Sequence, residues 1–193
     1  MRFMFPVSVL LLCVACMGAG GCYSTAWYRG DGEMVQSKFD VAKCSLFLPK
    51  ISLTEEGERT FMIDRLPNQS TSVYLLADSE EEWARALRSG AKITMRVQHP
   101  DGTFVEMSGY PGGRGSWSAV ERYLMTPDSK RSVERRRVLG GGSLSGRAFE
   151  KIASKGPYVI TFAVKPSQEE EKAEEVELRP VVVFNEFQRM WVP

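Results

Sequence analysis

Alternation of apolar and polar residues is the pattern that most restricts how this chain can fold. It is clearest at residues 92–98, Lys-Ile-Thr-Met-Arg-Val-Gln, where every second side chain is apolar. A period of two is typical of a β-strand with one face buried and the other in water. The turn-forming sequence Pro100-Asp101-Gly102 then leads into a second such segment, 103–108. Residues 92–108 therefore predict a β-hairpin.

Further strands are predicted where β-branched and aromatic residues gather, at 45–53, 59–65, 72–77, 117–124, 158–165 and 176–187. The last two are expected to be neighbours in one sheet. Pro180 lies inside the final strand, and because proline donates no backbone hydrogen bond, it suggests an edge position or a bulge.

Helix is expected to be a minority element. Ser79 followed by Glu82 has the pattern of a capping box, so a helix is predicted from there to about Arg88, with Trp83 and Leu87 facing the core. A second, weaker helix is predicted at 147–153.

Many short strands with turn signals between them predict an all-β fold, an antiparallel β-sandwich with one or two short helices. A small β-barrel is the alternative. Residues 39–193 are expected to form this single domain, since their number and composition suit one core. The formal net charge of +1 provides no overall field to attract nucleic acid.

The first 21 residues have the layout of an export signal. Arg2 precedes an apolar run, and small residues lead directly into Cys22. Ala19-Gly20-Gly21-Cys22 resembles the lipobox of bacterial lipoproteins, although leucine is commonest where this chain has Ala19. The resemblance covers residues 1–22 only.

The resemblance implies that a diacylglyceryl group is attached to the Cys22 thiol and that the chain is cut just before this residue. Residues 22–38 are then expected to be a lipidated N-terminus and flexible tether. Cys16 is the alternative anchor. An ordinary cleaved signal and a membrane-spanning helix are the other readings of this segment, but the apolar run is shorter than the roughly 20 residues that a span needs. By analogy with the class, Tyr23 after the cysteine permits an outer-membrane location facing the periplasm in a Gram-negative cell.

Cys44 lies in an apolar, strand-like segment, and a buried inert thiol is the expected reading. If Cys16 were the anchor, Cys22 and Cys44 could form a disulfide.

Motifs for catalysis are incomplete in this sequence. His99 is the single histidine and is expected to be an exposed turn residue. The glycine-rich stretch 138–147 lacks the Lys and Ser/Thr of a phosphate-binding loop, because Arg147 and Ala148 stand in their places. The acidic run 168–177 is expected to be a solvated hairpin loop. No cofactor or metal is predicted.

Two segments are candidates for recognition. The loop 108–117 carries Tyr110, Arg114 and Trp117, which are residue types that dominate interface energies, although Trp117 also suits a core position. The basic run 130–137 is expected either to pair with the acidic run or to contact an anionic lipid headgroup or acidic glycan.

The sequence therefore predicts a membrane-anchored cell-envelope lipoprotein with a non-enzymatic binding or structural β-domain. Its expected partners are the membrane, through the lipid, and an envelope protein, glycan or lipid, but not nucleic acid. The alternative is a periplasmic hydrolase that uses a pair of carboxylates.

Overall fold

The computed structural model describes residues 28–36, 44–64, 71–113, 117–127, 133–140, 157–167 and 175–184. Within these segments, no helix has the length and apolar character needed to cross a membrane. The second predicted helix, at 147–153, lies outside the described residues.

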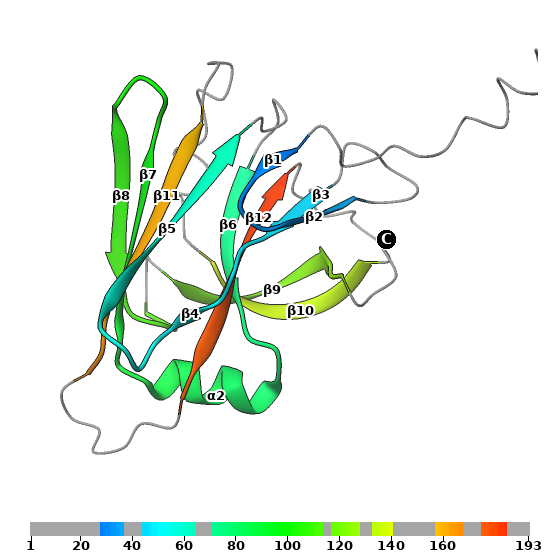
Figure 1. Ribbon diagram of the computed structural model, residues 1–193. Helices are drawn as coiled ribbons and strands as arrows, with labels where there is room; N and C mark the ends of the chain where they lie inside the picture. The colour runs from blue at the N-terminus through cyan, green and yellow to red at the C-terminus, as the bar shows by residue number, and fades with distance from the viewer. Residues whose placement is uncertain are drawn as a thin grey trace, which may run out of the picture.

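Two antiparallel sheets form the body of the protein (Figure 1). The first sheet has five strands in the spatial order β1-β5-β11-β7-β8. These are β1 Arg29–Gly30, β5 Gly57–Asp64, β11 Tyr158–Lys165, β7 Lys92–Gln98 and β8 Phe104–Gly109. The second sheet follows the order β2-β3-β12-β6-β10-β9, with the short β4 also paired to β12. Its strands are β2 Glu33–Gln36, β3 Cys44–Phe47, β4 Ile51–Ser52, β6 Thr71–Leu76, β9 Ser118–Met125, β10 Val133–Gly140 and β12 Glu177–Phe184.

The main core lies between the two sheets, so the predicted sandwich is confirmed and the barrel alternative is wrong. Inward-facing residues of both sheets, such as Ile160, Phe162 and Leu75, are fully buried in one cluster. The second sheet also has a smaller buried cluster on its other face, which includes Tyr74 and Val138. Alternate residues of these strands therefore contribute to different clusters, as the period of two requires.

The 92–108 hairpin is confirmed. β7 and β8 pair in register from Ile93 opposite Gly109 to Gln98 opposite Phe104. The strand predicted at 158–165 is also confirmed, and it lies between β5 and β7.

The strands β11 and β12 are not neighbours, and this part of the prediction is wrong. β11 pairs with β5 and β7 in the first sheet, whereas β12 pairs with β3, β4 and β6 in the second. The acidic run between them therefore does not connect the two strands of a hairpin. Both segments are equally rich in β-formers, so composition alone could not assign them to different sheets.

Pro180 occupies an interior strand, so of the two predicted alternatives, an edge position or a bulge, the edge position is wrong. The strand beside it is interrupted there, because β3 ends at Phe47 and β4 begins at Ile51. The Leu48 amide donates to the Pro180 carbonyl over 2.9 Å. In an antiparallel strand the N and C=O of one residue face the same neighbouring strand. The Pro180 nitrogen, which has no hydrogen to donate, therefore faces the gap between β3 and β4. The predicted single strand 45–53 is accordingly two short strands.

Residues 29–36 are part of the folded body, although they were expected to be tether. β1 pairs with β5 and β2 pairs with β3, and Met34 and Val35 are buried. Gly32 turns the chain between them with a φ of +94°, and a Cβ added there would lie 2.5 Å from the Phe47 carbonyl oxygen. The short length of these strands leaves no sustained period for a sequence pattern to detect.

The helix α2, Glu80–Arg88, begins as predicted. The Glu82 amide donates to the Ser79 hydroxyl over 3.1 Å, and the Glu82 carboxylate accepts from the Asp78 amide over 2.7 Å. Trp83 is buried at the end of the core, but Leu87 is 37% exposed, so the prediction for Leu87 is wrong. Trp83 and Ala86 are the buried pair instead.

Candidate functional site

A pocket opens where β6 leaves the second sheet and the chain turns into α2. β9 pairs with β10 along its whole length, whereas β6 pairs with β10 only from Val138 to Gly140. On the side of β10 away from β9, Arg137 therefore lies beside the start of α2 instead of beside β6. The pocket encloses about 390 Å³, which is within the range of small-molecule sites. We call it the arginine pocket, and it is lined by Ala77, Asp78, Ser79, Glu80, Trp83, Glu121, Arg135, Arg136 and Arg137.

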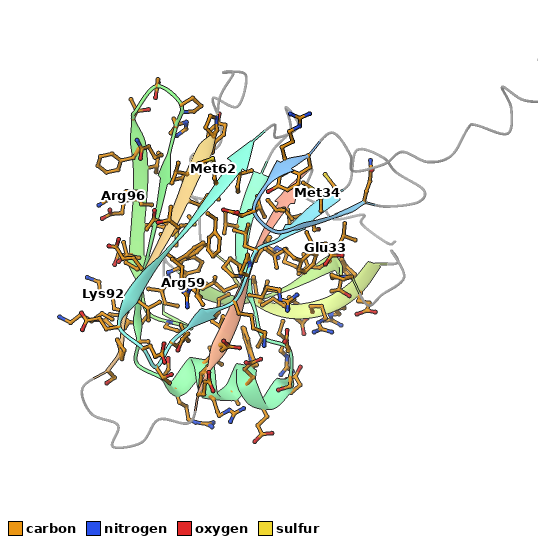
Figure 2. The ribbon with its side chains drawn as sticks, in the orientation of Figure 1. Glu33, Met34, Arg59, Met62, Lys92 and Arg96 are labelled. Atoms are coloured by element: carbon orange, nitrogen blue, oxygen red, sulfur yellow. The ribbon has the colours of Figure 1, made fainter. Side chains whose placement is uncertain are left out.

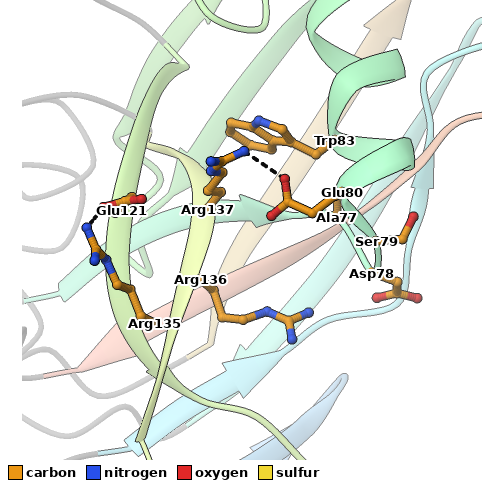
Figure 3. Close-up of a pocket in the computed structure, with 9 residues that line it drawn as sticks. All are labelled: Ala77, Asp78, Ser79, Glu80, Trp83, Glu121, Arg135, Arg136 and Arg137. Atoms are coloured by element: carbon orange, nitrogen blue, oxygen red, sulfur yellow. Dashed lines mark hydrogen bonds and ion pairs between the residues drawn. The ribbon is translucent and has the colours of Figure 1, made fainter.

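Two of its arginines are held by carboxylates from different elements (Figure 3). Arg137 reaches from β10 to Glu80 in the first turn of α2, with 2.7 Å between Nη1 and Oε2. Arg135 pairs with Glu121 of β9. All four side chains are at least 46% exposed, so each pair contributes only about 0.2–1 kcal/mol to stability. Their removal should therefore leave the fold intact.

Arg136 leaves β10 in the opposite direction to Arg135, as alternation along a strand requires (Figure 3). Its Nη1 lies 3.6 Å from Oε2 of Glu134. This is the longest of the three arginine pairs, and it is an ion pair without a close hydrogen bond. Arg136 therefore has donor capacity directed at the pocket.

The remaining wall combines a carboxylate and an indole. The Asp78 carboxylate lies 2.9 Å from Nζ of Lys50, which also contacts Glu177 at 3.2 Å. The hydrogen bond with Asp78 is the main cause that raises the pKa of Lys50. Trp83 completes the wall on the helix side (Figure 3).

Positive and negative side chains in the pocket are balanced, and this balance limits the kind of ligand that the pocket can bind. Each lining carboxylate has a cationic partner and each lining arginine has an anionic one, so no strong field of one sign is available to hold a free ion. Fixed guanidinium donors and carboxylate acceptors instead alternate around a concave wall. Hydroxyl groups both donate and accept, so a polyhydroxylated ligand would use both kinds of group.

The pocket does not support the carboxylate hydrolase. A general acid needs a carboxyl group in a desolvated, apolar setting that keeps it protonated. Asp78, Glu80 and Glu121 are instead 46–74% exposed and paired with cations. The part of the chain that the structure describes also contains no group of three or more His, Cys, Asp or Glu residues arranged to hold a metal ion.

His99 is buried, so the expectation of an exposed turn residue is wrong. It is 7% exposed, and its ring packs edge-on against Tyr158 at 5.4 Å between centroids. Its amide donates to the Thr103 carbonyl and closes the hairpin turn. Tyr158 is remote in sequence, and the hairpin pattern therefore did not indicate this burial.

The loop 108–117 is divided between surface and core. Tyr110 is 54% exposed, whereas Trp117 is fully buried and donates from Nε1 to the Ile93 carbonyl over 3.0 Å. Trp117 is therefore a core residue and not part of a recognition surface. Arg114 lies outside the described residues.

Cys44 is buried with a free thiol, as expected. Burial raises the pKa of Cys44 to about 12, which keeps the thiol protonated and unreactive at neutral pH. Cys16 and Cys22 lie outside the described residues, and the identity of the anchor stays a prediction.

The sequence indicated the basic run, but it did not predict that part of this run forms a strand. Residues 130–132 lie outside the described residues, and residues 133–137 belong to β10, where Arg135, Arg136 and Arg137 pair with Glu121, Glu134 and Glu80 respectively. In the acidic run, 168–174 lie outside the described residues, and Glu177 pairs with Lys50. The partners Glu80 and Glu121 come from elements that only the tertiary fold brings to β10.

No family model matches the chain, and no curated protein matches it. Among solved structures, the chain has a likeness to TmCBM61, determined in complex with β-1,4-galactotriose. The likeness covers 86% of this chain and 92% of that chain at 12% identity, with a TM-score of 0.25.

Proposed function

We propose that this protein is a lipid-anchored protein of the cell envelope, attached through Cys22, whose β-sandwich is a non-enzymatic binding module for a glycan. In a Gram-negative cell it would be held at the outer membrane and face the periplasm. The observation that carries the binding proposal is the arginine pocket, a concave wall of paired donors and acceptors beside Trp83. The anchor rests on the sequence Ala19-Gly20-Gly21-Cys22.

A glycan suits the pocket better than a free anion or an apolar ligand. Guanidinium and carboxylate groups from β10, β9 and α2 lie side by side in pairs, so a ligand hydroxyl can meet a donor and an acceptor together. Trp83 is only 7% exposed, so it contributes a small apolar part of the wall, and the paired polar groups would make most of the contact with a sugar ring.

The binding proposal is tested with the full-length protein in detergent micelles. The probes are purified peptidoglycan sacculi, in co-sedimentation, and soluble neutral galactan and glucan, in affinity electrophoresis. We expect retention by at least one of these glycans. The double variant R135A/R137A should weaken that binding about tenfold, equivalent to roughly 1.4 kcal/mol.

Arg59→Ala is the matched control, because Arg59 is an exposed arginine of β5 in the other sheet (Figure 2). It should bind as the unchanged protein does. Absence of binding to every probe, or equal weakening by Arg59→Ala, would contradict a glycan site in the pocket.

The anchor is tested by metabolic labelling with an alkyne fatty acid in a Gram-negative host. Cys22→Ser should abolish labelling and release the protein from the membrane fraction, whereas Cys16→Ser should do neither. Loss of label in Cys16→Ser alone would move the anchor to Cys16.

A further inference from the structure

The outer face of the first sheet carries a row of four residues at one end, of which Met62 and Phe104 are exposed and apolar, Val159 is half-buried and Gln98 is polar. Met62, Val159, Gln98 and Phe104 lie opposite one another across β5, β11, β7 and β8. Met62 is 53% and Phe104 is 60% exposed. Three strand spacings separate these two residues, about 14 Å. We call these four residues the apolar row, after its three apolar members.

The chain enters the fold directly beside this row. Asp31 makes two hydrogen bonds with the backbone of Met62. Its amide donates to the Met62 carbonyl over 2.8 Å, and its carboxylate accepts from the Met62 amide over 2.7 Å. Arg29 lies opposite Asp64, further toward the same end of the sheet. The N-terminal entry point and the apolar row therefore share one end of the sandwich.

The distance from the lipid to this end is short. Only residues 23–27 separate Cys22 from Tyr28, and Tyr28 already packs against the core. Even fully extended, this segment spans no more than about 20 Å. An acyl chain on Cys22 would thus hold the row close to the bilayer surface, a step that rests on the proposed anchor.

The arginine pocket lies toward the opposite end. α2 leads into Lys92 at the start of β7, and Gln98 of the row is at the end of the same strand, about 20 Å away at 3.4 Å per residue. Figure 1 shows α2 at one end of the sandwich and β1 at the other. Figure 2 shows Met62 and Lys92 at these two ends of the first sheet.

The chemistry of the row suits the boundary between headgroups and acyl chains. The Arg96 guanidinium lies 5.0 Å from the centroid of the Phe104 ring, and Arg96 also binds Glu106 at 2.8 Å. An aromatic ring with a cation beside it can place its apolar part in lipid and its charge among phosphates. Asp31 and Asp101 are exposed at the same end, so attraction to anionic lipid is not the driving force.

We propose that the apolar row rests on the surface of the bilayer that holds the lipid anchor, so that the arginine pocket faces away from the membrane. The occupant of the row is the headgroup and upper acyl region of that bilayer. The glycan taken by the pocket would then come from a layer beyond this membrane and not from its headgroups.

The test uses the full-length lipoprotein in phosphatidylcholine vesicles that contain a nitroxide-headgroup lipid. A fluorophore is attached at Thr103→Cys beside the row or at Glu81→Cys on α2, and the buried Cys44 thiol stays unlabelled. We expect several-fold stronger quenching at position 103 than at position 81. Equal quenching, or stronger quenching at position 81, would overturn the orientation.

A second comparison separates contact from mere tethering. In the Thr103→Cys protein, adding Met62→Ser and Phe104→Ser should reduce quenching while the protein stays with the vesicles. Tyr123→Ser is the matched control, because Tyr123 is 58% exposed on β9 and should leave quenching unchanged. Unaltered quenching in the double variant would overturn the contact alone, whereas loss of the unmodified protein from the vesicles would overturn the anchor and the contact together.

Discussion

At the scale of single residues, Trp117 is a tightly constrained position of the core. It is fully buried and adopts a φ of +51°, which non-glycine residues seldom take. Its ring centroid lies 6.3 Å from that of Phe162. Its indole N–H satisfies the Ile93 carbonyl.

We expect Trp117→Phe to lower the free energy of unfolding by about 1–3 kcal/mol, because it leaves the buried Ile93 carbonyl without this donor. Trp117→Ala should cost about 3–5 kcal/mol through the cavity that it adds. Urea denaturation measures both. Tyr110→Ala, at an exposed position of the same loop, should stay within about 0.5 kcal/mol, and a comparable loss there would refute the distinction between core and surface.

Because of Cys44, the free energy of unfolding should depend on pH in the alkaline range. The pKa of the Cys44 thiol is about 12 in the fold, whereas an exposed thiol has a pKa of 9.0. Between these values the unfolded chain releases the proton while the folded protein retains it, so the free energy of unfolding falls as pH rises above 9.

The measurement for this residue is the difference in stability between the unchanged protein and Cys44→Ala at several pH values from 8 to 11. That difference should shrink as pH rises. A constant difference would show that the Cys44 thiol does not titrate differently in the two states.

At the scale of elements, the start of α2 was the most predictable feature. Ser79 and Glu82 are close in sequence, and their hydrogen bonds form within the helix start itself. Local chemistry was therefore enough to predict it.

Ser79→Ala should lower stability by about 1 kcal/mol, because the Glu82 amide loses its acceptor. Thermal unfolding measures this, and Ser79→Asp should restore most of the loss. No change in Tm for Ser79→Ala would mean that the cap contributes nothing.

β10 was the least predictable element. Three consecutive arginines conceal its alternation, and their charges suggested a solvated surface. Val138 and Leu139 are nevertheless buried on opposite faces of the second sheet, because β10 pairs with β6 and β9 on its two sides. Which strands flank a segment is a long-range property that its own residues do not encode.

At the scale of the whole molecule, β1 and β2 join the N-terminal segment to both sheets. Met34 packs in the core between the sheets, and Val35 packs in the smaller cluster on the other face. Burial of two such side chains contributes on the order of 3–6 kcal/mol, a large part of the 5–15 kcal/mol that holds a typical domain folded.

A lipid-free chain that begins at Phe39 should therefore unfold at a markedly lower urea concentration than one that begins at Ser24, or should aggregate. Both chains are compared by urea denaturation and by size-exclusion chromatography. Equal stability of the two would show that β1 and β2 are dispensable and that a tether can extend to residue 38.

The sequence alone determined the class of fold, the central hairpin, the start of α2 and the inert character of Cys44, because each depends on a local period, a turn or a cap. Only the tertiary structure decided that β11 and β12 belong to different sheets, that His99 is buried against Tyr158, and that Arg135 and Arg137 meet Glu121 and Glu80. These features depend on contacts between residues that are distant in the chain. A pattern of single residues specifies which faces must be buried, but the pairing of strands decides what each face meets.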